Sequence, residues 1–370
     1  MQARWLSPLW VVATIDFTFN LLPCAYLLTF VCFFLYSNFL VPLMPHTQLS
    51  LRFYPVGTPG HAWGPADVAQ WRARQVRQRS HAVDVLAAVD AMRASWDVET
   101  YGEVAKPSVS TGLSADATQG GATTYPLLAL RSRGWHSALP TVLVTGGVHG
   151  YETSGVHGAL RFAARHAAAY AGRVNLLVVP CVSPWAYEHV QRWNADALDP
   201  NRSFRPNSPA PESAALWQLV APLRGQFAAH IDLHETTDTD ETEFRPAVAS
   251  RDGKPFVPGT IPDGFYLVAD SARPQLAFQQ AIISAVEHIT HIAPADGQGG
   301  IIGSPLLARG VIAYDMQALG LCAGITGAPL TTTTEVYPDS PSVIPDVCVA
   351  AQVAAVEATL DWVLNSGSPA

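Results

Sequence analysis

Charged residues are scarce in this chain of 370 residues: Asp, Glu, Lys and Arg make up 14% of it, and the formal net charge is −8. No Lys- or Arg-rich run is present, so we expect no nucleic-acid partner. Cysteine is also sparse. The cysteines are odd in number, widely spaced and without a Cys-x-x-Cys pair, which argues against a disulfide framework and a thiolate zinc site. They are Cys24, Cys32, Cys181, Cys322 and Cys348.

The first 45 residues differ in composition from the rest of the chain. Residues 17–44 are nearly all apolar and long enough to span a bilayer, and no small-x-small cleavage site follows them. They are either a membrane anchor or a gene-model extension ahead of a true start at Met44. We therefore predict a catalytic domain at residues 46–370, cytoplasmic if the chain starts at Met44 and membrane-anchored otherwise. Any membrane contact is expected through residues 1–45 alone.

Apolar residues make up 49% of the chain, and their spacing predicts alternating strands and helices from residue 140 onwards. Strands are expected at 141–145, 174–180, 228–233, 265–269, 310–315 and 331–337, and helices at 152–171, 212–223, 274–288 and 345–364. Ahead of them we predict one helix at 66–96 and strands at 97–104 and 125–131. This order indicates an α/β fold with a mostly parallel, mixed central sheet and helices on both faces.

Potential metal ligands follow two of these strands. The segment at 146–152 reads Gly-Gly-Val-His-Gly-Tyr-Glu, which places His149 and Glu152 at a strand-to-helix corner, and His234 follows the strand at 228–233. Two imidazoles and one carboxylate can bind a catalytic zinc ion and leave one coordination position open. His149 and Glu152 alone fit equally well a helix start where the dipole favours Glu and a buried histidine.

A third segment carries a family resemblance. Residues 192–202 read Arg-Trp-Asn-Ala-Asp-Ala-Leu-Asp-Pro-Asn-Arg, which resembles the pattern Arg-x-Asn-x-x-Gly-x-Asp-x-Asn-Arg of the zinc carboxypeptidases. Ala197 replaces the usual Gly, which could alter the turn. With His149, Glu152, His234 and a later Glu335 in the same order, the resemblance spans about residues 125–365. The aspartoacylase and succinylglutamate desuccinylase group is related to this family.

The resemblance implies how the reaction is catalysed. His149, Glu152 and His234 would hold one zinc ion. Glu335 would act as general base, and Arg192 would polarise the scissile carbonyl.

It also implies how the substrate is held. Asn201 and Arg202 would bind a terminal carboxylate, for which the planar guanidinium fork is suited. Tyr314 would cover the substrate, although the local sequence can also be aligned to place Met316 there.

An acidic run follows His234: Glu235, Asp238, Asp240, Glu241 and Glu243. Such a run usually faces solvent. It could instead favour a basic substrate or supply carboxylates to a second metal ion.

Three functions are compatible with these residues. The first is a carboxypeptidase acting on a peptide, and the second is an amidohydrolase acting on an N-acyl amino acid. The third, an inactive scaffold, conflicts with the complete set of ligands and base. The amidohydrolase group commonly adds a C-terminal β-domain, whereas here a predicted helix at 345–364 follows Glu335, which favours the carboxypeptidase.

Overall fold

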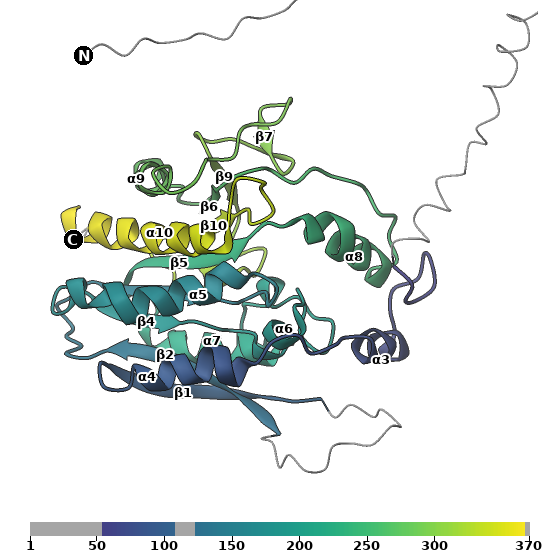
Figure 1. Cartoon of the computed structure of the whole chain (residues 1–370), viewed down its shortest axis with the longest axis horizontal. Coiled ribbons are helices and arrows are strands. Elements are labelled where there is room, and N and C mark those ends of the chain that lie inside the picture. Colours follow the sequence, from purple (N-terminus) through teal and green to yellow (C-terminus); the bar gives the residue numbers. More distant parts are fainter. Residues whose placement is uncertain (1–53, 108–122, 367–370) are drawn as a thin grey trace, which may run out of the picture. The chain divides into compact units, whose positions relative to one another are not determined.

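A mixed sheet runs through the computed structural model, which describes residues 54–107 and 123–366 (Figure 1). The predicted apolar segment at 1–45 lies outside these residues. The eight strands of the sheet lie in the order β1–β2–β4–β3–β5–β10–β6–β9. Their bounds are β1 Trp96–Ala105, β2 Thr124–Ser132, β3 Thr141–Gly146, β4 Asn175–Val179, β5 Phe227–Glu235, β6 Tyr266–Asp270, β9 Val311–Tyr314 and β10 Leu330–Val336. A separate hairpin joins β7, Gly300–Ile301, to β8, Ser304–Pro305.

The centre of the sheet is parallel and its flanks are mixed. Strands β4, β3, β5 and β10 pair in parallel, as do β6 and β9, whereas β1 with β2, β2 with β4, and β10 with β6 are antiparallel. This confirms the predicted α/β class with a mixed sheet. Because β3, β5 and β10 run in the same direction, their carboxyl ends meet at one edge, where ligands bind in open α/β sheets.

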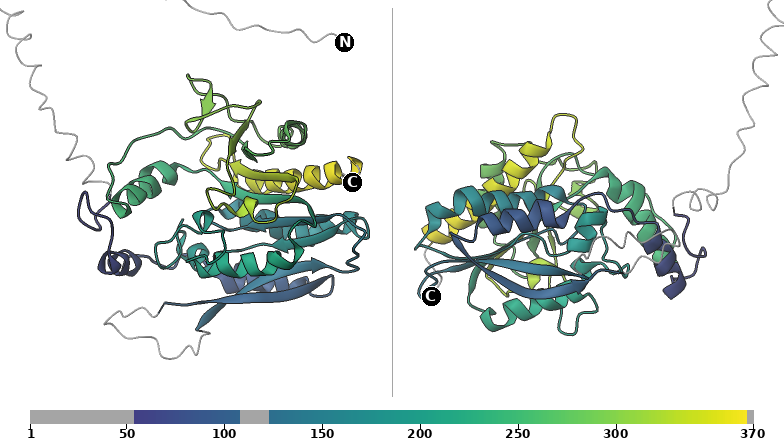
Figure 2. Two further views of the ribbon diagram at one scale, coloured as in Figure 1. Left: turned by 180° about the vertical axis from the view of Figure 1, so that it is seen from behind. Right: turned by 60° about the horizontal axis from the view of Figure 1, so that its bottom comes forward.

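Helices cover both faces of this sheet (Figures 1 and 2). One face is covered by α4 (Ala87–Ala91), α5 (Thr153–Arg161), α9 (Leu276–Val286) and α10 (Pro345–Asn365) over a large apolar core. On the other face α7 (Pro211–Val220) packs against β1, and a second apolar core lies beneath it. The predicted helices at 152–171, 212–223, 274–288 and 345–364 correspond to these elements, although the first continues as π-helical and 3₁₀ turns after Arg161.

Helix α10 is the one described helix that is long and apolar enough to cross a membrane. It packs against α5 and α9, and Val349, Val353, Val356 and Leu360 are buried in the core. These contacts are those of a core helix.

The predicted single helix at 66–96 is wrong. Helix α3 (Pro65–Ala73) ends early, and a π-helical turn at Ala82–Leu86 leads into α4. Between them the backbone N–H groups of Gln78 and Arg79 donate to the Glu188 carbonyl, and that of His81 donates to the Glu188 carboxylate. These tertiary bonds replace helical ones, and Val76 in this segment is 70% exposed.

Two short helices were not predicted, α6 (Pro184–His189) and α8 (Arg245–Arg251). Both are shorter than the window over which helical periodicity can be recognised. Helix α6 contributes Glu188 to the contacts just described, and α8 forms part of the pocket wall.

A buried carboxyl group near the start of α7 makes stability depend on pH. Glu212 is 1% exposed, and burial raises its pKa from 4.5 to about 7. The folded state therefore binds a proton that the unfolded state releases between these pH values, so stability falls as pH rises through this window. We expect Glu212→Gln to be more stable than the parent at pH 8 by roughly 3 kcal/mol, with little difference near pH 4.5.

Urea unfolding of both proteins at pH 4.5 and pH 8 measures this difference. Glu103→Gln, at an exposed position of β1, is the matched control and should behave alike at both pH values. An equal effect of Glu212→Gln at both pH values would contradict the assignment.

Candidate active site

Three potential metal ligands converge at the carboxyl edge of the sheet. His149 and Glu152 lie at the β3–α5 corner and His234 on β5, all three buried, with one ligand atom of each within 4.8 Å of the others. Nδ1 of His149 lies 2.7 Å from Oε1 of Glu152, and Nδ1 of His234 lies 2.7 Å from Oε2 of the same carboxylate. The structure thus brings together the three residues that the sequence predicts as ligands.

Glycine makes the β3–α5 corner possible. Gly147 has φ of +64°, a left-handed conformation that side chains other than glycine rarely adopt. A Cβ atom at Gly150 would overlap the backbone of Ala186 and Tyr187. The glycines therefore let the chain reverse closely enough to bring His149 to Glu152.

Two carboxylates bind the Nε2 atoms of the imidazoles, on the side of each ring that faces away from Glu152. Nε2 of His149 lies 3.0 Å from Oδ1 of Asp199, and Nε2 of His234 lies 2.7 Å from Oδ2 of Asp232. Because these ionised carboxylates accept from Nε2–H, the Nδ1 lone pairs are the ones left for a metal. Neither Asp was assigned a role in the sequence analysis. Two features could have identified them: Asp199 stands at the Asp position of the carboxypeptidase-like motif, and Asp232 precedes His234 by two residues on β5, so both point to one face.

The charges of the cluster compensate each other. Burial alone would raise the pKa of Glu152, but the two imidazoles hold it well below its usual range. Burial alone would lower the pKa of His234, but Glu152 and Asp232 hold it well above the usual value. Oε2 of Glu152 is buried, and Nδ1 of His234 at 2.7 Å is its partner in the described residues. A divalent cation would satisfy this atom and replace the proton on His234, so the donor set fits a metal ion.

Asp199 connects this cluster to the rest of the segment at 192–202. Besides His149, it accepts from Nε of Arg192 at 3.1 Å and from the backbone N–H of Asn201 at 2.9 Å. Burial alone would raise the pKa of Asp199, but Arg192 holds it well below its usual range. Ala197 within the motif has φ of +56°, so it adopts the left-handed conformation for which Gly is favoured.

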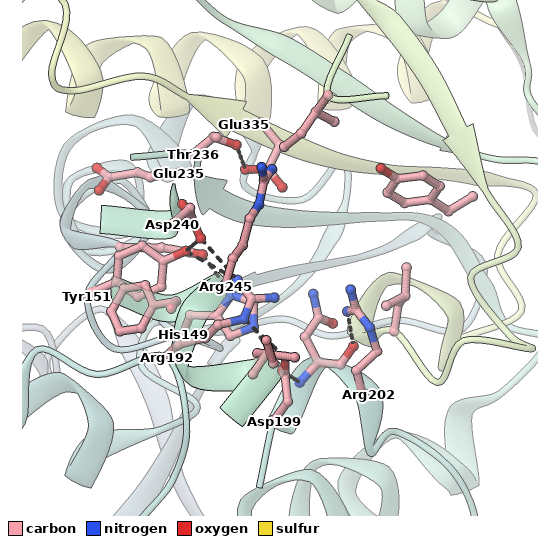
Figure 3. Close-up of a pocket in the computed structure, with 18 of the residues that line it drawn as sticks. His149, Tyr151, Arg192, Asp199, Arg202, Glu235, Thr236, Asp240, Arg245 and Glu335 are labelled. Carbon is pink, nitrogen blue, oxygen red and sulfur yellow. Dashed lines mark hydrogen bonds and ion pairs between the residues drawn. The ribbon is translucent and has the colours of Figure 1, made fainter. Parts of the chain in front are cut away.

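Arg192 lies between two carboxylates (Figure 3). Its Nη1 lies 3.4 Å from Oδ1 of Asp240 and 3.3 Å from the hydroxyl of Tyr151, while Nε binds Asp199. Asp199 and Asp240 thus fix the guanidinium at the pocket wall.

Asn201 and Arg202 lie on the 3₁₀ turn Pro200–Arg202 and line the same pocket. The Asn201 side-chain oxygen accepts from the Cys322 N–H at 2.8 Å, and Nη1 of Arg202 donates to the Asn201 carbonyl at 2.7 Å. Tyr314 also lines the pocket, whereas Met316 is fully buried in an apolar cluster. Of the two candidates for the residue that covers the substrate, Tyr314 is the one that lines the cavity.

Glu335 stands on β10 directly beside His234 on β5. Its Oε2 accepts from the Thr236 hydroxyl at 2.8 Å, and Thr236 lies 2.8 Å from the Tyr266 hydroxyl. Burial raises the pKa of Glu335 to about 8. A carboxyl group with this pKa is suited to exchanging protons near neutral pH.

The acidic run does not simply face solvent. Glu235 is buried and accepts from the N–H groups of Thr153 and Ser154 at the start of α5, and Asp240 accepts from Tyr151. Glu241 pairs with Arg245. Within residues 54–107 and 123–366, His149, Glu152 and His234 are the one group placed to share an ion, so a second metal ion gains no support.

A cavity of about 670 Å³ joins these groups (Figure 3). Charged side chains line it from three places: the metal ligands His149 and Glu152, the segment at 192–202, and α8 with residues 252–254. Another part of the lining, near β6 and β10, is uncharged apart from Glu335 and includes Tyr266, Val268, Ile302, Leu321 and Thr333.

Asp199 should carry much of the local stability. Asp199→Ala leaves Arg192, the Asn201 N–H and Nε2 of His149 without their shared acceptor, so we expect a loss of about 3 kcal/mol or more. Asp97→Ala is the control. It removes an exposed ion pair in which Oδ1 of Asp97 lies 3.4 Å from Nε of Arg133, and it should lower the free energy of unfolding by less than about 1 kcal/mol. Urea unfolding compares them, and equal losses would refute the buried role of Asp199.

A known protein family matches the part of the chain that contains the metal ligands. Residues 138–254 match the family described as Succinylglutamate desuccinylase/Aspartoacylase catalytic domain, which includes His149, Glu152 and His234 but not Glu335. Among curated proteins, none has a sequence significantly similar to this chain.

Solved structures share its fold at low sequence identity. A candidate metallopeptidase from Shewanella amazonensis is 20% identical over 78% of this chain and 99% of its own, with a TM-score of 0.56. A metallo-carboxypeptidase from Burkholderia cenocepacia is 16% identical over 78% and 69%, with a TM-score of 0.51. Carboxypeptidase A from Helicoverpa armigera is 12% identical over 87% and 81%, with a TM-score of 0.52.

The family match and the converging ligands support a metal-dependent hydrolase. In sequence motif and in fold, the chain resembles the zinc metallocarboxypeptidases and the related succinylglutamate desuccinylase/aspartoacylase group.

Proposed function

We propose that this protein is a zinc-dependent carboxypeptidase that removes an apolar C-terminal residue from a peptide. One observation carries the proposal: a single cavity contains the edge of the His149–Glu152–His234 cluster, Glu335, Arg202 and an uncharged wall. These are the parts that water activation, carboxylate binding and side-chain selection require.

His149, Glu152 and His234 would hold the zinc ion through the two Nδ1 atoms and the carboxylate. When bound, zinc would polarise the scissile carbonyl and lower the pKa of a water molecule. Two nitrogens and one oxygen leave a coordination position open, which is typical of a catalytic rather than a structural site.

Glu335 is the proposed general base. It would take a proton from the attacking water and deliver it to the departing amine. The Thr236 hydroxyl bond orients its carboxylate, and its position next to His234 keeps it within the metal-ligand edge of the cavity. Arg192, fixed by Asp199 and Asp240, is the proposed donor to the developing oxyanion.

Arg202 is the proposed anchor for the terminal carboxylate, together with Asn201. Its side chain is exposed at the cavity wall and makes one hydrogen bond, to the neighbouring Asn201 carbonyl, so further N–H donors are available for a ligand. Tyr314, which also lines the cavity, is the proposed cover over the bound residue.

The uncharged wall supports an apolar side chain at the substrate's C-terminus. Val268 and Leu321 are 3% and 5% exposed and belong to one apolar cluster with Tyr266. A charged side chain placed against these groups would lose hydration without gaining a partner, which is costly.

Hydrolysis of N-acyl amino acids is the second candidate, and the family match over residues 138–254 favours it. The carboxypeptidase is favoured by the segment after Glu335, where α10 packs against α5 and α9. Both reactions would use the same metal ligands and base, so the substrate separates them.

A substrate panel tests the carboxypeptidase proposal. The panel consists of short peptides that differ only in the C-terminal residue. Those ending in Leu or Phe should be cleaved with kcat/KM at least about tenfold above those ending in Asp or Arg. Their C-terminal amides should be poor substrates because Arg202 has no carboxylate to bind. Cleavage of N-acetyl or N-succinyl amino acids with no cleavage of peptides would instead favour the second candidate.

Glu335 and Arg202 should fail in different ways. Glu335→Gln removes proton transfer, so we expect kcat to fall roughly 10²- to 10⁴-fold with little change in KM. Arg202→Ala removes ground-state binding, so KM should rise for free-acid peptides, and the defect should shrink on amidated ones. Arg205→Ala, an exposed arginine on the same segment outside the cavity lining, serves as the control. Equal losses from Arg202→Ala on both substrates would contradict the anchor.

A further inference from the structure

A buried row of polar side chains continues behind His234, away from the cavity. Alternation along β5 puts His230, Asp232 and His234 on one face of the strand. Thr145 on β3 pairs in register with Asp232 and joins the row. His230, Asp232 and Thr145 are fully buried, and His234 is 1% exposed. The proposed reaction uses only the last member of this row.

The hydrogen bonds in the row have a determined direction. The Thr145 hydroxyl donates to Oδ1 of Asp232 at 2.6 Å, while Oδ2 of Asp232 accepts from Nε2–H of His234 at 2.7 Å. Nε2 of His230 lies 3.0 Å from the Thr145 oxygen. A hydroxyl has one hydrogen, which is already given to Asp232, so Nε2–H of His230 must donate to Thr145.

The state of His230 agrees with this direction. Burial lowers the pKa of His230 to about 4, so the ring is neutral and carries one N–H. That hydrogen belongs on Nε2. Nδ1 is then the ring nitrogen without a hydrogen, and it is buried. The Cys322 thiol, 3.6 Å from the Thr145 oxygen, also donates to that hydroxyl.

We propose that Thr145 and His230 are positioning residues that set the metal affinity of His234 by fixing Asp232. The inference rests on the proposed metal site. Oδ1 of Asp232 is held by Thr145, so Oδ2 stays directed at Nε2 of His234. This keeps the hydrogen on Nε2 and the lone pair on Nδ1, which faces Glu152. Without the Thr145 hydroxyl, Asp232 can rotate, and the imidazole orientation is no longer fixed.

Two pairs of variants separate hydrogen bonding from packing. Thr145→Val keeps the shape and removes the hydroxyl, and Thr145→Ser keeps the hydroxyl. His230→Leu removes the donor, and His230→Gln retains an N–H near Nε2. Thr332→Val is the matched control. Thr332 is also a fully buried strand residue, and its hydroxyl donates to Gln279 of α9 on the opposite face of the sheet.

Zinc affinity, measured by competition with a chromophoric chelator on the full chain, is the readout. We expect Thr145→Val to bind zinc about tenfold more weakly, at the lower end of the usual effect of losing a partner behind a metal ligand. Thr145→Ser should stay within about threefold of the parent. His230→Leu should weaken zinc binding less than Thr145→Val does, and His230→Gln should restore it. Thr332→Val should lose stability without losing zinc affinity.

Unchanged zinc affinity in both Thr145→Val and His230→Leu would overturn the proposal, as would an equal loss in Thr332→Val. If Thr145→Val does not fold, the His230 pair decides by the same criterion. A parent protein that binds no zinc would refute the proposed function as well. Zinc binding that is insensitive to Thr145 and His230 would refute only this inference.

Discussion

The structure depends on a buried carboxylate held between two imidazoles. Glu152, with 1% exposure, could not remain ionised at this depth without His149 and His234 beside it. The imidazoles in turn are held by Asp199 and Asp232. Each of these four partners stands on a different element or register position, so the cluster forms only when β3, β5 and the segment at 192–202 are all in place. The sheet edge and the metal site are therefore a single structural unit.

Asp199 extends this unit to the rest of the cavity. One carboxylate binds His149, Arg192 and the backbone of Asn201, so the metal ligand and the groups proposed to bind substrate are fixed to one another. Strand alternation adds the remaining parts. Glu335 and Thr333 face the cavity, whereas Thr332 and Thr334 on the same strand bond the glutamines of α9 and α10. A shift of one residue in the register of β10 would turn Glu335 towards the core beneath α9 and α10.

The longer elements from residue 140 onwards were predictable because β-branched runs and long apolar helices bury continuous faces, whereas the short helices α6 and α8 were not. The helix expected at 66–96 was not, because Glu188, far away in sequence, takes its backbone donors. His149, Glu152 and His234 could be identified from motifs that follow strand ends. The roles of Asp199, Asp232 and Thr145 could not, because they depend on which imidazole nitrogen faces which neighbour. The solvent-facing interpretation of the acidic run fails at Glu235 and Asp240 for the same reason, since Glu235 caps α5 and Asp240 binds Tyr151 and Arg192.

The central claim is that one metal ion binds through the Nδ1 atoms of His149 and His234 and the Glu152 carboxylate. X-ray diffraction at the zinc absorption edge, from crystals loaded with one equivalent of zinc, tests it most directly. We expect one anomalous peak roughly 2.0–2.2 Å from these three ligand atoms, with Asp199 and Asp232 still bonded to the two Nε2 atoms. A peak at another site, ligation through Nε2, or no peak at this cluster would contradict it.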